Sequence, residues 1–184
     1  MSLEISPQFW WYLARASGIV CFVLLTASLV WGVLLHTRAL RDIDRPGWLL
    51  DMHTWLSGLA IVTMILHCVA LVADNYVHFG WAEILVPDAS SWKTGPVTLG
   101  VIALWLLVLV QGTTLFRRWL PRKIWKFIHL FSYASWFLVA LHSGLAGTDA
   151  TSRAYQAVAL LATIAAVSAT FLRVTSPRRR PKPS

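Results

Sequence analysis

The stretch LDMHTWLSGLAIVTMILHCVALVA, residues 50–73, decides how this chain folds. A helix needs about 20 mostly apolar residues to cross about 30 Å of hydrocarbon, and this run is long enough. It carries two histidines, His53 and His67, which lie fourteen positions apart along the chain. Ionisable side chains are costly inside a membrane, so they are candidates for a functional site by default. We therefore predict a transmembrane helix that contributes to a functional site.

Four further apolar runs of similar length lie on either side of this stretch, and no proline interrupts any of the five. They cover residues 17–35 (with a start as early as Phe9), 97–116, 124–146 and 154–172. A soluble bundle would need a polar face on each helix, and these runs lack one. We predict an all-α integral membrane protein with a bundle of about five transmembrane helices. We expect residues 1–176 to form a single transmembrane domain and residues 177–184 a basic cytoplasmic tail.

The charges of the chain indicate its orientation. Of its 184 residues 57% are apolar and 13% charged, against about 45–50% and about 25% in soluble domains, yet the net charge is +8. Thirteen of the 16 basic residues lie between the first and second runs, between the third and fourth, and after the fifth. Basic loops stay in the cytoplasm, so we expect the N-terminus outside and the C-terminus inside. This pattern explains the positive charge without nucleic-acid binding.

Four of the six histidines form a two-by-two pattern. His129 and His142 lie thirteen positions apart on the fourth run, which enters the membrane from the same side as the second. Each pair of histidines is separated by roughly 20 Å along its helix. His53 and His129 therefore share the inner level, and His67 and His142 the outer level. Two imidazoles at each of two depths predict two b-type haems with no open axial position for a substrate.

One geometric difficulty follows from the spacing. At about 100° per residue, fourteen steps bring the second ring to within about 40° of the first, whereas thirteen steps leave it about 140° away. We expect helix tilt, local overwinding toward a 3₁₀ helix, or rotated haem planes to resolve the difference in the fourth run. Otherwise one of the four histidines is not a ligand.

Several other residues are weaker candidates. Arg15 lies on the outer side, where it would pair with a propionate of the outer haem or serve as an interfacial arginine. His36 and His78 are expected at the surface, with no assigned role. The segment 78–87 is expected to form a short helix that lies on the outer face of the membrane that the chain spans. Small residues beside the histidines leave room for a porphyrin or serve helix packing; they are Gly58, Ala60, Ser132 and Ala134.

Three segments resemble the ferric reductase-like transmembrane domain family, whose members include the membrane parts of NADPH oxidases, metalloreductases and the haem subunit of a bacterial methionine-sulfoxide reductase system. They are YLARASGIV (12–20), DMHTWLSGLAIVTMILH (51–67) and IWKFIHLFSYASWFLVALH (124–142), and the resemblance extends over about residues 11–148. The histidine spacing of fourteen and then thirteen is itself characteristic of the family. The resemblance implies bis-histidine haem b and electron transfer across the membrane, with His53, His67, His129 and His142 as ligands.

The chain departs from the family in two ways. Family members usually have six helices with ligands on the third and fifth, whereas here the ligands fall on the second and fourth. The oxidases also carry a flavin- and NADPH-binding domain after the last helix, and this sequence contains no strand–GxGxxG–helix unit. Electrons are therefore expected from a partner protein or from membrane quinol.

These observations predict an oxidoreductase subunit in the bacterial cytoplasmic membrane. A cytoplasmic flavoprotein or quinol would reduce the inner haem, and the outer haem would reduce an extracytoplasmic acceptor. The basic loop 117–126 suits an acidic flavoprotein. Two alternatives remain open. The same haems would oxidise superoxide or another outer donor and reduce quinone, or the chain is a non-redox subunit whose histidines relay protons.

Overall fold

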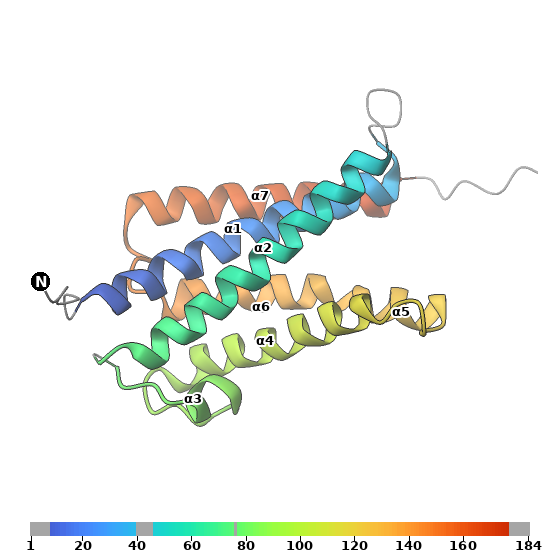
Figure 1. Ribbon diagram of the computed structural model, residues 1–184. Helices are drawn as coiled ribbons and strands as arrows, with labels where there is room; N and C mark the ends of the chain where they lie inside the picture. Colours follow the sequence, from blue (N-terminus) through green and yellow to red (C-terminus); the bar gives the residue numbers. More distant parts are fainter. Residues whose placement is uncertain (1–7, 40–45, 76, 177–184) are drawn as a thin grey trace, which may run out of the picture.

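A computed structural model describes residues 8–39, 46–75 and 77–176 (Figure 1). The described chain folds into a bundle of helices that run roughly side by side, with a short helix at one end. In chain order the helices are α1 (Phe9–Thr37), α2 (Pro46–Ala73), α3 (Trp81–Leu85), α4 (Thr94–Leu115), α5 (Arg122–His129), α6 (Phe131–Ala146) and α7 (Arg153–Thr175).

The predicted fold class is confirmed. Within the described residues, five helical segments are long and apolar enough to cross a membrane, so the chain is a multi-pass membrane protein. The first predicted run begins at Phe9, and the predicted surface helix within residues 78–87 is α3. The fourth predicted run is one spanning segment, Arg122–Ala146, that a break at Leu130 divides into α5 and α6. The predicted basic tail 177–184 lies outside the described residues.

Helix α1 is the centre of the bundle. It packs most extensively against α2 and also contacts α6 and α7, while α4 packs against α6. Among the described helices, α2 packs closely with neither α4 nor α6. The bundle therefore consists of two tight antiparallel pairs, α1–α2 and α4–α6, which α1 joins along one side.

Small residues allow the helices of each pair to approach closely. Ala14 of α1 and Ala60 of α2 are almost fully buried, and the Cys21 thiol donates to the Ala60 carbonyl at 3.4 Å. Between α4 and α6, the buried Ser135 hydroxyl donates to the Ala103 carbonyl at 3.1 Å. Without a hydrophobic effect between helices in lipid, such close backbone contacts stabilise the association. Of the two interpretations of Ala60, the structure favours helix packing.

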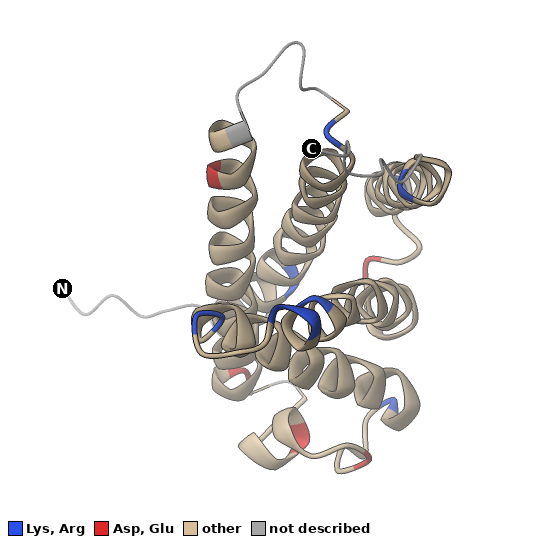
Figure 2. Cartoon of the chain, turned by 90° about the vertical axis from the view of Figure 1, so that its right-hand side faces the viewer, with Lys and Arg blue, Asp and Glu red and all other residues tan. Residues whose placement is uncertain are grey.

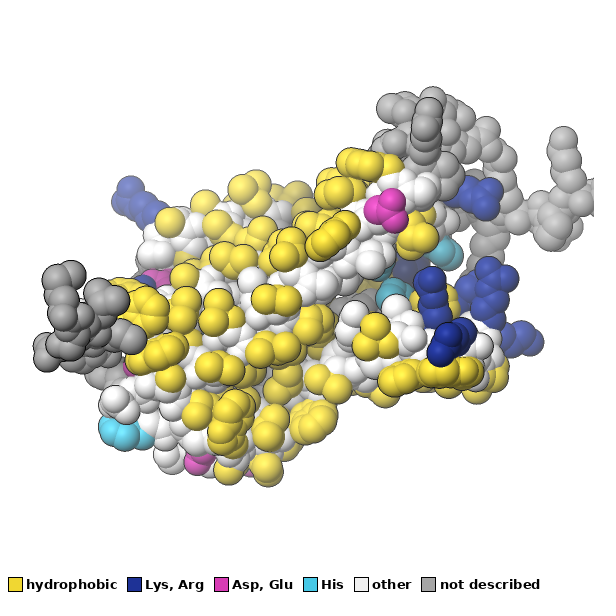
Figure 3. Space-filling view, viewed as in Figure 1, with side chains coloured by type: hydrophobic (Ala, Val, Ile, Leu, Met, Phe, Trp, Pro, Cys, Tyr) yellow, Lys and Arg dark blue, Asp and Glu magenta, His cyan; other side chains and the backbone are white. Residues whose placement is uncertain are grey.

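Basic residues gather at one end of the bundle, where α1 and α7 end and α2 begins (Figures 2 and 3). We name it the basic end. Seven of the ten described Lys and Arg residues lie there: Arg38, Arg117, Arg118, Arg122, Lys123, Lys126 and Arg173. The other three, Arg15, Lys93 and Arg153, lie toward the opposite end. The described chain therefore has the charge asymmetry predicted from the sequence.

The packing of α1 on α2 predicts the effect of enlarging Ala60. Ala60→Leu adds a branched side chain to a position with 0% exposure. We expect a loss of about 1–3 kcal/mol of stability from overpacking, measured by thermal unfolding in detergent micelles. Ala134→Leu is the matched control, since Ala134 is exposed on α6. Equal stability of the two variants would contradict this account of the α1–α2 interface.

Candidate functional site

The structure brings the four predicted histidines together in two pairs. His53 near the start of α2 faces His129 at the end of α5, with ring centroids 6.0 Å apart and ring planes at 70°. His67 of α2 and His142 of α6 line one cavity in the half of the bundle away from the basic end. The pairing by depth that the sequence predicts is thus present.

The distance between His53 and His129 suits one metal ion held between the two rings. Two metal–nitrogen bonds of about 2.0 Å and two ring radii of about 1.2 Å add up to about 6.4 Å between centroids, close to the 6.0 Å observed. Among the described residues, no group of three or more His, Cys, Asp or Glu side chains is arranged to hold a metal ion. A haem requires only two protein ligands, because its porphyrin supplies the other four.

The cavity beside His67 and His142 lies between the two helix pairs and is mainly apolar. Side chains from α1, α2, α4 and α6 form its walls, and Phe79, Glu83 and Ile84 in and before α3 close one side. Its walls include Gly18, Leu25, Met64, Val101, Leu104, Leu107 and Val139. An apolar site with two imidazoles fits a flat, largely apolar ligand that needs axial nitrogen atoms.

Three of the four histidines are held in the same way by a neighbouring helix. The Nδ1 atom of His67 lies 2.7 Å from the Ala14 carbonyl oxygen, and the ring packs on Gly18, one turn further along α1. A Cβ atom on Gly18 would lie 3.0 Å from that Nδ1 atom. The glycine therefore lets the ring reach a backbone carbonyl that a larger side chain would cover.

The same arrangement recurs at His53 and His142. In each case the carbonyl belongs to the residue four positions before a glycine, and the glycine leaves room for the ring. His53 Nδ1 lies 2.9 Å from the Ser28 carbonyl oxygen beside Gly32, and His142 Nδ1 lies 2.8 Å from the Pro96 carbonyl oxygen beside Gly100. A Cβ atom on Gly100 would lie only 2.6 Å from the His142 Nδ1 atom.

These contacts determine the tautomer of the three rings. A carbonyl oxygen only accepts hydrogen bonds, so each Nδ1 atom carries the hydrogen and donates it. In a neutral imidazole the Nε2 atom then has a free lone pair. Metal-ligating histidines usually donate their other ring N–H to a carbonyl or carboxylate in this way. The three rings are therefore prepared to bind a metal through Nε2.

Sequence reasoning missed these glycines, although a signal was available. The spacing from Gly18 to Gly32 on α1 equals the spacing from His53 to His67 on the antiparallel α2. Equal spacing on two antiparallel helices keeps both glycines opposite both histidines. By contrast, a Cβ atom on Gly58, a residue that the sequence marked as a candidate, would meet nothing within 4 Å.

His129 is held differently from the other three histidines. Its Nδ1 atom is buried and has no hydrogen-bond partner among the described residues. Its ring lies against Trp125, with centroids 5.3 Å apart. Ser135 and His142 both contact backbone carbonyls of α4, so they lie on the face of α6 that is turned toward α4. They are seven residues, or two helical turns, apart. Seven residues before Ser135, the same face continues at Ile128. His129 is one residue, about 100°, off this face and points toward α2 instead.

The overwinding expected in the fourth run occurs at the break between α5 and α6. Leu130 N–H donates to the Phe127 carbonyl at 3.1 Å, and Tyr133 N–H donates to the Leu130 carbonyl at 3.1 Å. Such bonds between residues three apart are those of a 3₁₀ helix, which turns about 120° per residue. The tighter winding reduces the angle of about 140° that the spacing of His129 and His142 would leave on a regular helix.

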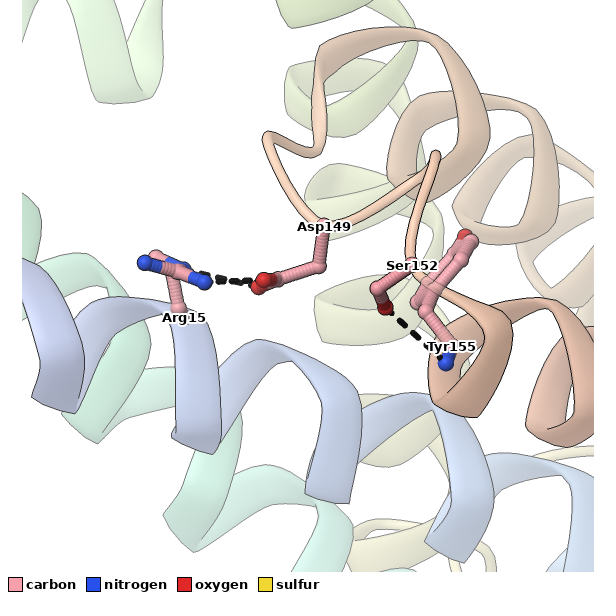
Figure 4. Close-up of polar contacts among 4 residues, drawn as sticks. All are labelled: Arg15, Asp149, Ser152 and Tyr155. Atoms are coloured by element: carbon pink, nitrogen blue, oxygen red, sulfur yellow. Dashed lines mark hydrogen bonds and ion pairs between the residues drawn. The ribbon is translucent and has the colours of Figure 1, made fainter.

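Arg15 also lines the cavity but is already engaged there with Asp149 (Figure 4). Its Nε atom donates to Asp149 Oδ2 at 2.7 Å, and a terminal nitrogen contacts the other carboxylate oxygen. Asp149 belongs to the turn before α7, whose first residues are capped by Ser152 accepting from Tyr155 N–H at 3.2 Å. Arg15 therefore ties α1 to the α6–α7 connection. Its pairing with a haem propionate stays a prediction.

The two remaining histidines lie apart from both pairs. His36 is exposed near the end of α1, and His78 is exposed before α3 with a φ angle of 58°. The surface positions expected for both are thus confirmed.

The fold and the two histidine pairs define a multi-pass helical membrane protein with a candidate metal-cofactor site between two helix hairpins. Neither a family model nor a curated protein nor a solved structure matches the chain.

The glycine contacts predict the effect of adding one methyl group. In Gly100→Ala the new Cβ atom would overlap His142, so the ring or helix α6 must shift, at a cost of about 1–3 kcal/mol. In the control Gly112→Ala, also on α4, nothing lies within 4 Å of the new atom, and stability is expected to stay equal or to rise by up to about 1 kcal/mol. Thermal unfolding of both variants in the same detergent measures the difference. A Gly100→Ala variant as stable as Gly112→Ala would contradict the close approach.

Proposed function

We propose that this protein is a membrane electron-transfer subunit that holds two b-type haems, one at each histidine pair. The main support is the repeated arrangement of histidine, carbonyl and glycine, which leaves Nε2 free on three of the four rings. His53 and His129 would hold the haem nearer the basic end. His67 and His142 would hold the other. Haem iron with two imidazole ligands supplies one-electron transfer without an open coordination position.

The residues of the chain orient the rings and keep water away. Each carbonyl–Nδ1 hydrogen bond fixes a ring against rotation, and the close glycine keeps it at the helix surface. The apolar walls beside His67 and His142 exclude water, and low polarity around a redox group is one means of tuning its potential. The buried Nδ1 atom of His129 has no such restraint among the described residues. The two pairs are therefore expected to differ in potential.

The basic end is the proposed side of electron entry. Because basic loops remain in the cytoplasm, this end faces the cytoplasm in our proposal. Its exposed cations Arg117, Arg118, Arg122, Lys123 and Lys126 form a surface that would attract an acidic flavoprotein, with quinol as the other proposed donor. Electrons would leave at the opposite end to an extracytoplasmic acceptor, and the membrane would be the bacterial cytoplasmic membrane.

Haem content tests the proposal directly. The protein purified in mild detergent is expected to contain about two haems b per chain, as two bis-histidine sites require. The pyridine haemochrome assay measures the amount, and the reduced-minus-oxidised spectrum identifies the type through its α band. A preparation from haem-sufficient cells that is folded but lacks this band would refute the proposed function and favour the histidine proton relay.

Single substitutions of the histidines test the ligand assignment. His67→Ala and His142→Ala are each expected to lower the haem content from two to about one, because one axial ligand is lost at the same site. His53→Ala and His129→Ala are expected to affect the other haem. His36→Ala is the matched control, since His36 is exposed and outside both pairs. Full retention of both haems in His142→Ala would show that His142 is not a ligand.

The orientation is tested by labelling from outside the cell. In a variant with Cys21 and Cys68 replaced by Ala, a single cysteine is placed either at Arg153 or at Lys123, which lie at opposite ends of the bundle. A membrane-impermeant maleimide is expected to label the Arg153 position in intact cells and the Lys123 position only after lysis. The reverse pattern would overturn the proposed direction of insertion while leaving the haem assignment intact.

A further inference from the structure

A groove runs along the lipid-facing side of the bundle between α6 and α7. Both helices pack against α1, but they do not pack closely against each other, so a gap floored by α1 remains between them. The residues that line it are Leu29 of α1, Tyr133 and Trp136 of α6, and Ala166, Val167, Thr170 and Phe171 of α7. These residues extend from the middle of the bundle toward the basic end.

The groove becomes more polar toward the basic end. Deep in the bundle, Trp136 donates its Nε1–H to the Thr26 hydroxyl at 2.9 Å, which leaves an apolar indole face to the groove. One turn nearer the basic end is Tyr133, whose hydroxyl accepts from Arg173 at 2.9 Å. The Arg173 guanidinium also lies over the Tyr133 ring, 5.2 Å from its centroid. A cation therefore lies beside Tyr133, the residue that lines the groove at this end.

No carboxylate balances this cation in the described chain. The ion pair that the described residues form is Arg15–Asp149, toward the opposite end. The acidic residue described at the basic end is Asp51, which is exposed on α2, away from the groove. His36 lies near enough to both Arg173 and Lys126 for electrostatic interaction, so a second cation, Lys126, lies at this end of the bundle. Tyr133 engages one terminal nitrogen of Arg173, so further N–H donors remain for an anion.

We propose that this groove binds an anionic phospholipid of the leaflet at the basic end. One acyl chain would lie in the groove between α6 and α7, and Arg173 would donate to the phosphate. Arginine binds phosphate oxygens through parallel hydrogen bonds, and a phosphate supplies the negative charge that the described residues do not place beside Arg173. A quinol has a neutral headgroup and would leave the cation unbalanced. This site does not depend on the haem assignment.

Native mass spectrometry of the full chain in mild detergent tests the site. Phosphatidylglycerol and phosphatidylcholine with identical acyl chains are added in parallel, and the retained lipid is counted. Phosphatidylglycerol is expected to be retained at least about tenfold better, because both lipids carry the phosphate but the choline ammonium neutralises it in phosphatidylcholine. Arg173→Gln is expected to abolish the preference, and Arg173→Lys to keep part of it.

A second variant tests the groove without removing the charge. Val167 is 60% exposed and lines the groove, so Val167→Trp fills the groove with little disturbance of the core. We expect it to retain neither lipid, because the acyl chain no longer fits in the groove, and so to show no preference for phosphatidylglycerol. Ile164→Trp on the same helix is the control for size, because Ile164 is 53% exposed and lies outside the lining. Arg153→Gln, at the opposite end of α7, is the control for charge.

Three results would overturn the proposal. The first is an unchanged preference for phosphatidylglycerol in both Arg173→Gln and Val167→Trp. The second is displacement of the bound lipid by glycerol phosphate at equal concentration, which would show that the acyl chain contributes nothing. The third is stronger retention of a short-chain ubiquinone than of phosphatidylglycerol, which would assign the groove to a quinone. Loss of haem in any of these variants is recorded separately, so that failure of one proposal is not taken for failure of the other.

Discussion

The hydrogen bond from a histidine Nδ1–H to a helix carbonyl beside a glycine is the interaction on which the bundle depends. Inside a membrane there is no water to satisfy a ring N–H, so a partner must come from the protein. A helical carbonyl already accepts one bond within its helix, but it has a second lone pair. Gly18, Gly32 and Gly100 expose that lone pair to a neighbouring helix. The same contact therefore satisfies the ring, orients it and sets the distance between the helices.

The two levels of the site follow from one difference in spacing. On α2 the two histidines are fourteen positions apart, so both face α1 and both find a carbonyl there. The histidines of α5 and α6 are one position closer together, so His142 faces α4 while His129 turns toward His53. The break at Leu130 contributes to this arrangement. Its tighter winding turns His129 further around the helix axis, relative to His142, than a regular α-helix would. The asymmetry between the two levels is therefore built into the chain.

Much of this arrangement could be predicted from the sequence. The five spans and α3 follow from the length of the apolar runs and from the prolines and polar loops that separate them. The depth pairing of the histidines follows from alternating helix direction, which charge in the loops reveals. The glycine partners were missed because they depend on the register between two helices, and a composition pattern on one helix does not contain it. The Arg15–Asp149 pair joins residues 134 positions apart, and only the fold brings them together.

The arrangement of the two helix pairs has a consequence for how the protein is made. Each pair takes its hydrogen bonds from neighbouring segments of the chain: α1 supplies the carbonyls for α2, and α4 supplies those for α6. During synthesis the first hairpin can satisfy the buried nitrogen atoms of its own histidines before any later helix leaves the ribosome. The second hairpin can do the same for His142. Neither has to wait in the bilayer with those polar groups unpaired, so insertion can proceed two helices at a time.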